Sequence, residues 1–226
     1  MTPLETTDLL EDRSLRGPDF CRALTERIDG FLAEVFAAAD PPTGTALVAV
    51  GGYGRREQCP GSDVDVVLVH PSGVAIADVA ERVWYPLWDA GLKLGHQVGT
   101  LPQLLEVASE HLDTATSLLA ARPVAGDPAV AERLAAEALE QWSGRSRRHL
   151  DDLQASVAER HARYGEVAFL LEPDLKESRG GLRDVHNLLW VEQATVPILR
   201  EVESAGLVAA AETLLAVRVE LHRLTG

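Results

Sequence analysis

The stretch between Gly51 and Asp65 concentrates residue types that bind phosphate and divalent metal ions. Gly51, Gly52 and Gly54 occupy three of four consecutive positions, and glycine lets backbone amides approach an anion closely because no side chain intervenes. A helix that begins at Arg55 adds the partial positive charge of its N-terminus. The residue order is neither that of a Walker A loop nor that of the GxGxxG dinucleotide motif. The sequence therefore predicts a different phosphate-binding turn; the alternative is a tight turn without a ligand.

Asp63 and Asp65 are candidate metal ligands at the start of an apolar run. They stand two residues apart, and the two-residue period of a strand places both carboxylates on one face. Two carboxylates at a buried strand repel each other unless a cation compensates, and hard oxygen ligands suit magnesium bound to substrate phosphates. The alternative is that Asp63 caps a loop while Asp65 faces water. We predict a divalent-metal site formed by both aspartates.

The elements that must position these residues follow from hydrophobic periodicity. Apolar residues recur every four positions over 19–39, which predicts a helix that Pro41 and Pro42 end. Short apolar runs at 46–50 and 64–69 predict strands buried on both faces, and residues 92–98 alternate as a strand does. The remaining patterns predict helices at 75–89, 101–121, 128–142, 146–169, 181–194 and 205–224.

These elements predict an α/β domain followed by an all-α domain. We expect a flexible arm over residues 1–18, because this segment is polar and ends in Gly17 and Pro18. A mixed α/β domain is expected over 19–125, and a helical bundle over 126–226.

Composition restricts the partners and the compartment. The formal net charge of −14 over 226 residues disfavours a nucleic-acid binder, because such proteins present a basic face to phosphate. Cys21 and Cys59 form no CxxC motif, so we expect neither a disulfide framework nor a structural zinc site. The N-terminal segment lacks a signal-peptide pattern, and no apolar run approaches the roughly 20 residues that span a bilayer. We expect a cytoplasmic protein without a membrane segment.

Two separate blocks carry a resemblance to a known family. The block GGYGRREQCPGSDVDVVLV, residues 51–69, resembles the signature of the DNA polymerase β-like nucleotidyltransferase superfamily. The block EPDLKESRGGLRD, residues 172–184, resembles a segment in the helical domain of bacterial PII uridylyltransferases, the GlnD-like family. This resemblance implies a mixed-sheet nucleotidyltransferase fold and a magnesium-dependent enzyme. It also implies transfer of UMP or AMP from UTP or ATP to a tyrosine of the PII nitrogen-signalling protein.

The resemblance also implies roles for individual residues. Asp63 and Asp65 are expected to hold Mg²⁺ and to be catalytic. The expected nucleotide-binding residues of the first block are Gly51, Gly52, Arg55 and Ser62. Lys176 and Arg179 of the second block are expected to reach the nucleotide phosphates from the helical domain; the alternative is that both are solvated surface cations.

The chain departs from the family pattern at two points. Many superfamily members place a third acid on a later strand, but residues 92–98 contain none, and Asp89, Asp113 and Glu172 are the alternatives. The family also continues into hydrolase and glutamine-sensing domains, so we expect a fragment or a reduced relative. Two other functions remain open: a catalytically degenerate nucleotide-sensing or docking module, and a nucleotidyltransferase that acts on a small molecule.

Overall fold

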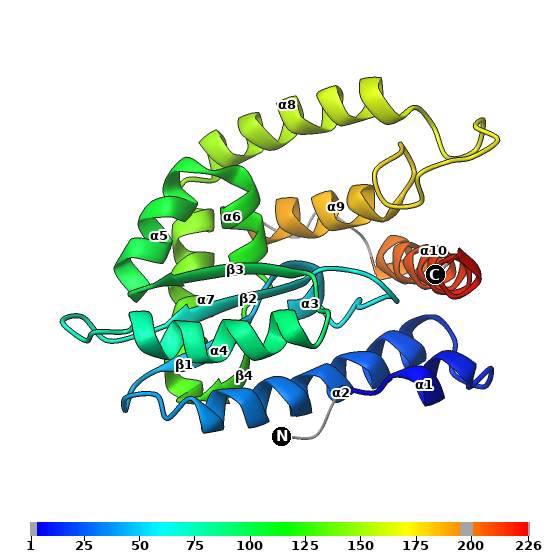
Figure 1. The fold of residues 1–226 in the computed structure, drawn as a ribbon. Helices are drawn as coiled ribbons and strands as arrows, with labels where there is room; N and C mark the ends of the chain where they lie inside the picture. Colours follow the sequence, from blue (N-terminus) through cyan, green and yellow to red (C-terminus); the bar gives the residue numbers. More distant parts are fainter. Residues whose placement is uncertain (1–3, 195–200, 226) are drawn as a thin grey trace.

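The computed structural model describes residues 4–194 and 201–225, without the side chains of 201–203 (Figure 1). Four strands form one mixed sheet in the order β3-β2-β1-β4. Strand β2 is parallel to β3, whereas β1 is antiparallel to both β2 and β4. The strands are β1 (Ala46–Ala49), β2 (Val64–Val69), β3 (Leu94–Gly99) and β4 (Arg122–Gly126). This arrangement bears out the mixed α/β class predicted from the sequence.

Helices precede, connect and cover these strands (Figure 1). The helices of the first half are α1 (Thr7–Glu11), α2 (Gly17–Ala38), α3 (Gly51–Gly54) and α4 (Ala77–Asp89). Those of the second half are α5 (Leu101–Glu110), α6 (Leu112–Leu118), α7 (Pro128–Gly144), α8 (Ser146–Tyr164), α9 (Leu182–Ala194) and α10 (Glu201–Thr225). None of these helices, over the described residues, is long and apolar enough to cross a bilayer.

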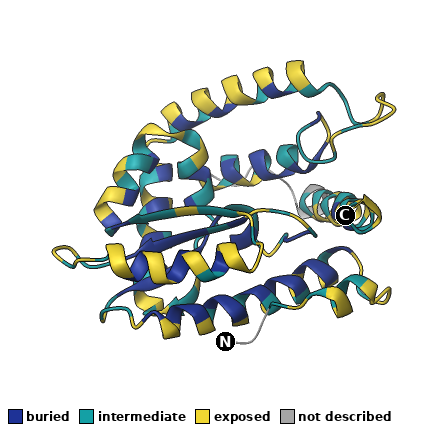
Figure 2. Ribbon diagram, viewed as in Figure 1, coloured by how far each residue is buried: buried dark blue, intermediate teal, exposed yellow. Residues whose placement is uncertain are grey.

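Strands β1 and β2 are buried on both faces, as their apolar runs predict (Figure 2). On one face, alternate side chains of β1 and β2 such as Leu47 and Leu68 pack with helices α2 and α4. On the other face, Val48 and Val67 pack with α5, α6 and α7. Because a strand alternates its side chains between faces, two helical layers cover every apolar residue of these strands. Asp65 is the only residue of β2 that is not buried.

Several boundaries differ from the predicted ones. The predicted helix over 101–121 is two helices that meet at His111, and α8 ends at Tyr164 instead of residue 169. Strand β4 was not predicted, because its five residues carry no alternating apolar pattern and include Pro123. Its position at the edge of the sheet explains how the proline is accommodated.

The flexible arm expected over residues 1–18 stays a prediction, but residues 4–18 make specific contacts with the rest of the chain. These residues include helix α1, and Leu9 and Leu15 pack against the core. Arg223 of α10 donates hydrogen bonds to the backbone carbonyls of both leucines at 3.0 Å. The partners of the segment lie some 200 residues away, so local composition could not indicate them.

Contacts also cross the predicted division at residue 125. Helix α10 returns to pack along α2, where a side chain on Gly17 would lie 3.0 Å from the β-carbon of Ala216. Helix α7 packs against β1 and β4. The division into two domains stays a prediction.

A buried polar network holds α3 in place beneath the sheet edge. The Tyr53 hydroxyl donates a hydrogen bond of 2.5 Å to Asp29 of α2, and Arg122 of β4 pairs with the same carboxylate at 2.7 Å. The Arg122 guanidinium also lies 5.5 Å from the centre of the Tyr53 ring. Burial and the neighbouring Asp29 charge raise the pKa of Tyr53. The network therefore joins the glycine-rich turn to elements on both sides of it.

Replacing Tyr53 by Phe removes the hydroxyl that Asp29 accepts from. We expect Tyr53→Phe to lower the free energy of unfolding by about 2 kcal/mol, because the lost hydrogen bond is to a charged group. Chemical denaturation measures this change. Tyr85 is 57% exposed, so Tyr85→Phe is the matched control. Equal stability of the two variants would contradict the structural role of the network.

Candidate functional site

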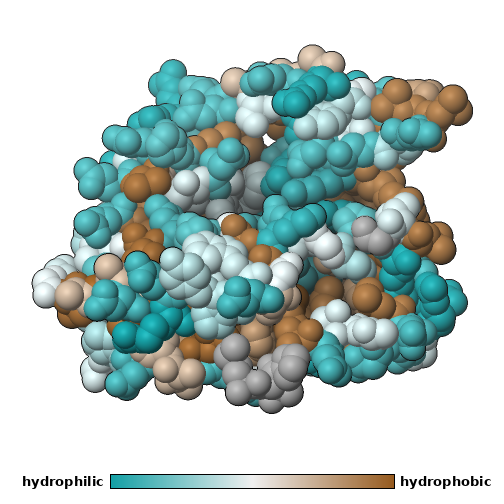
Figure 3. All heavy atoms as spheres, in the orientation of Figure 1, coloured by the Kyte–Doolittle hydropathy of each residue, from teal (hydrophilic) through white to brown (hydrophobic). Residues whose placement is uncertain are grey.

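A cavity of about 650 Å³ lies at one end of strands β2 and β3. Its walls come from α3, the loop after it, the two strands, α6, α9 and α10. On the face shown in Figure 3, the surface is hollowed between the strands and the upper helical layer, and hydrophilic side chains gather there. Both sequence blocks contribute to these walls, although more than a hundred residues separate them.

Asp63 and Asp65 lie together in this cavity, as the strand period predicts. Asp65 pairs with Gly95 of β3 in the parallel register. A β-carbon on Gly95 would come within 2.2 Å of Asp65 Oδ1, and one on Gly51 within 3.1 Å of Oδ2. The Asp65 carboxylate therefore occupies space that two glycines leave open.

The two aspartates suit a divalent cation. Burial raises the pKa of Asp65, and the nearby Asp63 charge raises it further. Within the described chain, no Lys, Arg or His side chain forms an ion pair with either carboxylate. Magnesium is commonly bound through one or two carboxylates together with substrate phosphates. The donor set of this cavity matches that pattern.

The candidates for a third acid divide into two groups. Asp113 of α6 lines the cavity, whereas Asp89 and Glu172 are exposed and lie outside its lining. The described residues nevertheless contain no cluster of three or more Asp, Glu, His or Cys side chains suited to a metal. Asp113 is thus a wall residue of the same cavity, and its role as a ligand stays a prediction.

The glycine-rich turn forms a one-turn helix that begins earlier than the sequence predicts. Helix α3 spans Gly51–Gly54, so Arg55 follows the helix instead of starting it. Gly51 has φ of +57°, a conformation that glycine adopts without strain. A side chain on Gly54 would lie 2.1 Å from the Ala120 carbonyl oxygen. Close packing therefore explains Gly54, and cavity geometry explains Gly51.

Arg55 and Ser62 both lie in the cavity wall. Arg55 Nε donates to Glu57 at 3.0 Å, which leaves its Nη groups for another acceptor. Arg55 Nη2 lies 3.8 Å from where a β-carbon of Gly52 would be. Ser62 Oγ is buried and has no hydrogen-bond partner within the described chain.

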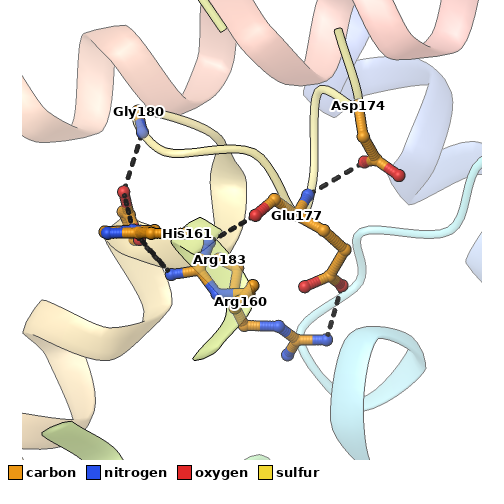
Figure 4. Close-up of polar contacts among 7 residues, drawn as sticks. Arg160, His161, Asp174, Glu177, Gly180 and Arg183 are labelled. Carbon is orange, nitrogen blue, oxygen red and sulfur yellow. Dashed lines mark hydrogen bonds and ion pairs between the residues drawn. The ribbon is translucent and has the colours of Figure 1, made fainter. Parts of the chain in front are cut away.

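The second block forms a loop that side-chain hydrogen bonds hold in shape (Figure 4). Asp174 Oδ1 accepts from the backbone amides of residues 176 and 177 at 2.9 Å. Arg160 of α8 donates to the Glu177 carbonyl at 2.5 Å and pairs with Asp184. Asp184 also accepts from the Gly180 amide at 2.7 Å. These contacts fix the loop before it enters α9.

The loop places Lys176 and Arg179, the two cations predicted to bind nucleotide, differently with respect to the cavity. Lys176 lines the cavity, and burial lowers its pKa. Arg179 lies outside the cavity lining, is 63% exposed and pairs with Glu166 at 3.3 Å. The structure thus brings Lys176 together with Asp63 and Asp65 and leaves Arg179 apart from them. Both roles in nucleotide binding stay predictions.

A hydrogen bond joins the first block to helix α9, which begins in the second block. His186 Nε2 of α9 donates to Glu57 Oε1 at 3.0 Å. Burial lowers the pKa of His186, which favours the neutral imidazole with its proton on the Nε2 atom that faces Glu57. Burial raises the pKa of Glu57, but the His186 hydrogen bond and the Arg55 charge outweigh this effect and lower it to about 2.

Sequence reasoning missed several residues of the cavity, among them His186 and Arg218. His186 lies two residues after the second block, and helical spacing places it on the same face of α9 as Arg183 and Trp190. That periodicity could have indicated His186. Arg218 carries no local signal, because only the return of α10 toward α2 brings it to the cavity.

Comparison with known proteins supports these observations. The family model described as GlnD PII-uridylyltransferase matches residues 148–226, and the DUF294 nucleotidyltransferase model matches residues 18–97. A bifunctional uridylyltransferase/uridylyl-removing enzyme of Streptomyces coelicolor is 44% identical over 96% of this chain. The chain is thus homologous, over nearly its whole length, to part of the GlnD PII-uridylyltransferases. This finding confirms the resemblance stated from the two sequence blocks.

Other uridylyltransferases show the same relationship at lower identity. The bifunctional enzymes of Mycobacterium tuberculosis and Burkholderia orbicola are 40% and 36% identical over 81% and 90% of this chain. The chain spans about a quarter of the length of these relatives, with 26% of the Streptomyces enzyme, 24% of the Mycobacterium enzyme and 25% of the Burkholderia enzyme covered.

The space that Gly95 leaves for Asp65 generates a test of the site. Gly95→Ala places a β-carbon against the Asp65 carboxylate and should displace it. We expect the rise in melting temperature with magnesium and UTP to need roughly tenfold more nucleotide. Gly144 has open space around its α-carbon, so Gly144→Ala is the matched control. If Gly95→Ala needed no more nucleotide than wild type for the same rise in melting temperature, the position assigned to the Asp65 carboxylate would be contradicted.

Proposed function

We propose that this chain transfers a nucleoside monophosphate, UMP or AMP, from a magnesium-bound nucleoside triphosphate to a tyrosine of the PII signalling protein. The observation that carries the proposal is the meeting of the two blocks in one cavity. Asp63 and Asp65 lie there with Arg55, Lys176 and other cations. Carboxylates without ion pairs, cations and a glycine-rich turn are the groups that a metal-bound triphosphate requires.

In the proposed reaction, the tyrosine hydroxyl attacks the α-phosphorus and pyrophosphate leaves. Backbone amides at Gly51 and Gly52 are placed to bind phosphate oxygens, because both glycines line the cavity at the start of α3. Ser62 Oγ, which lacks a protein partner, supplies a further hydrogen bond. Arg55 keeps its orientation through Glu57 and directs its Nη groups to the ligand.

Asp63 and Asp65 are the residues that would hold Mg²⁺. A bound magnesium ion supplies Lewis-acid stabilisation of charge on the phosphate oxygens. The glycines beside Asp65 fix its carboxylate without help from a cation of the protein. Lys176 adds positive charge to the same cavity.

A protein substrate agrees with the charge of the chain. A net charge of −14 opposes a nucleic-acid substrate. The curated relatives carry names that state uridylyl transfer, which favours UTP over ATP as the donor. A reducing, cytoplasmic setting agrees with Cys21 and Cys59, which are both buried free cysteines.

The direct test is transfer followed by intact mass. The 226-residue chain is incubated with PII protein, magnesium and UTP or ATP in separate reactions. We expect PII to gain the mass of one nucleoside monophosphate per modified tyrosine, and Asp63→Asn or Asp65→Asn to lower the rate at least a hundredfold through loss of a metal ligand. Nucleotide binding without transfer would instead identify a degenerate sensing module. A nucleoside monophosphate that is found on a small molecule instead of on PII would identify a small-molecule nucleotidyltransferase.

The Asp65→Asn variant also tests how the stability of the protein depends on pH. Because the pKa of Asp65 is raised in the folded protein, its ionised form destabilises the fold above the pKa of the unfolded chain. We expect Asp65→Asn to raise the melting temperature at pH 7 without metal. The gain should shrink as the pH falls through the raised pKa, since wild-type Asp65 then becomes protonated. Thermal unfolding between pH 4 and pH 8 measures it; a gain that is constant with pH would contradict the assignment.

A further inference from the structure

Four long cationic side chains line the cavity, and three of them already have carboxylate partners. Arg55 pairs with Glu57 at 3.0 Å. Lys176 and Arg183 both pair with Glu177, at 3.7 and 3.2 Å. The fourth is Arg218 of α10, which lines the same cavity and forms no ion pair within the described residues.

Helix α10 holds Arg218 rigidly at this position. Leu215 and Val219, on either side of Arg218 in the sequence, are buried in the core that α2 helps to form. One turn further on, His222 Nδ1 donates a 2.6 Å hydrogen bond to the Pro60 carbonyl in the loop between α3 and β2. The helix is thus anchored to the segment that leads to Asp63, and Arg218 lies on its cavity side.

The cations of this cavity converge on one region. Burial lowers the pKa of Lys176, and the positive charges of Arg183, Arg218 and Arg55 lower it further. Like charges that approach one another destabilise a protein unless an anion lies between them. Glu57 and Glu177 neutralise part of this charge, but Arg218 has no such partner among the described side chains.

We propose that Arg218 is a binding residue for the phosphate chain of the nucleotide. The inference rests on the proposed function, because it assigns a new residue to the same cavity. A guanidinium group presents paired N–H donors that match phosphate oxygens, and its charge does not titrate at physiological pH. Arg218 therefore supplies, from the last helix, a cation that has no ion-pair partner among the described residues and lines the same cavity as the glycine-rich turn.

The test compares Arg218→Ala and Arg218→Lys with Arg133→Ala. Arg133 is an exposed residue of α7 that pairs with Glu137 at 3.0 Å, so the control removes the same charge far from the cavity. Isothermal titration with UTP, with pyrophosphate and with uridine, all with magnesium, measures affinity at two salt concentrations. Thermal unfolding without ligand reports on the fold.

We expect Arg218→Ala to bind UTP and pyrophosphate roughly 10- to 100-fold more weakly, because a charged hydrogen bond is lost. Its salt dependence should fall as well, and Arg218→Lys should recover part of the affinity. Uridine binding should stay unchanged, which a general structural defect would not allow.

Two outcomes would overturn the inference. If wild type binds UTP and Arg218→Ala matches Arg133→Ala in UTP affinity, Arg218 has no phosphate contact and the proposed function stands. If wild type binds neither UTP nor ATP with magnesium, the proposed function fails and the inference fails with it.

Discussion

The structure around the cavity depends on keeping one half-buried carboxylate charged without a protein cation beside it. Asp65 lies on the central pair of strands, where every other residue of β2 is buried. A carboxylate in this position is unfavourable, as the raised pKa caused by burial and by Asp63 shows. The surrounding residues make room for it: Gly95 and Gly51 would each clash with or crowd the carboxylate if they carried a side chain. Such an arrangement is understandable when a ligand contributes the missing positive charge.

The positive charge of the protein is brought to this carboxylate from distant parts of the chain. Lys176 comes from a loop whose shape Arg160 and Asp184 maintain, and Arg218 comes from the C-terminal helix. Neither lies within ion-pair distance of Asp63 or Asp65. If they did, the aspartates would be neutralised and the cavity would attract a metal only weakly. Keeping the charges apart leaves both carboxylates and cations available to a ligand that carries phosphate and metal together.

The strands and the proximity of Asp63 and Asp65 could be predicted because their signals are local. The apolar runs at 46–50 and 64–69 reflect burial on both faces, and the spacing of Asp63 and Asp65 places them on one side of the chain. Strand β4 could not be predicted, because its own residues show no strand pattern and its conformation depends on pairing with β1. The start of α3 was predicted too late, because glycine is a weak helix former and Gly51 gave no sign of a helix start. Gly51 occupies this position because a side chain there would crowd the Asp65 carboxylate. The position of Arg218 in the cavity and the packing of residues 4–18 could not be predicted, because both depend on where α10 lies.

The hydrogen bond between Glu57 and His186 holds the segment after α3 against α9 without adding net charge to the cavity. Glu57 remains ionised throughout the physiological range, because its pKa is lowered to about 2 despite burial. Its charge is balanced by Arg55 at 3.0 Å, while burial lowers the pKa of His186 and favours its neutral form. The connection from the glycine-rich turn to α9 therefore adds no net charge. The charge in the cavity then comes from Asp63 and Asp65 and from the cations that line it, and a link that adds no net charge at pH 7 leaves this distribution unchanged.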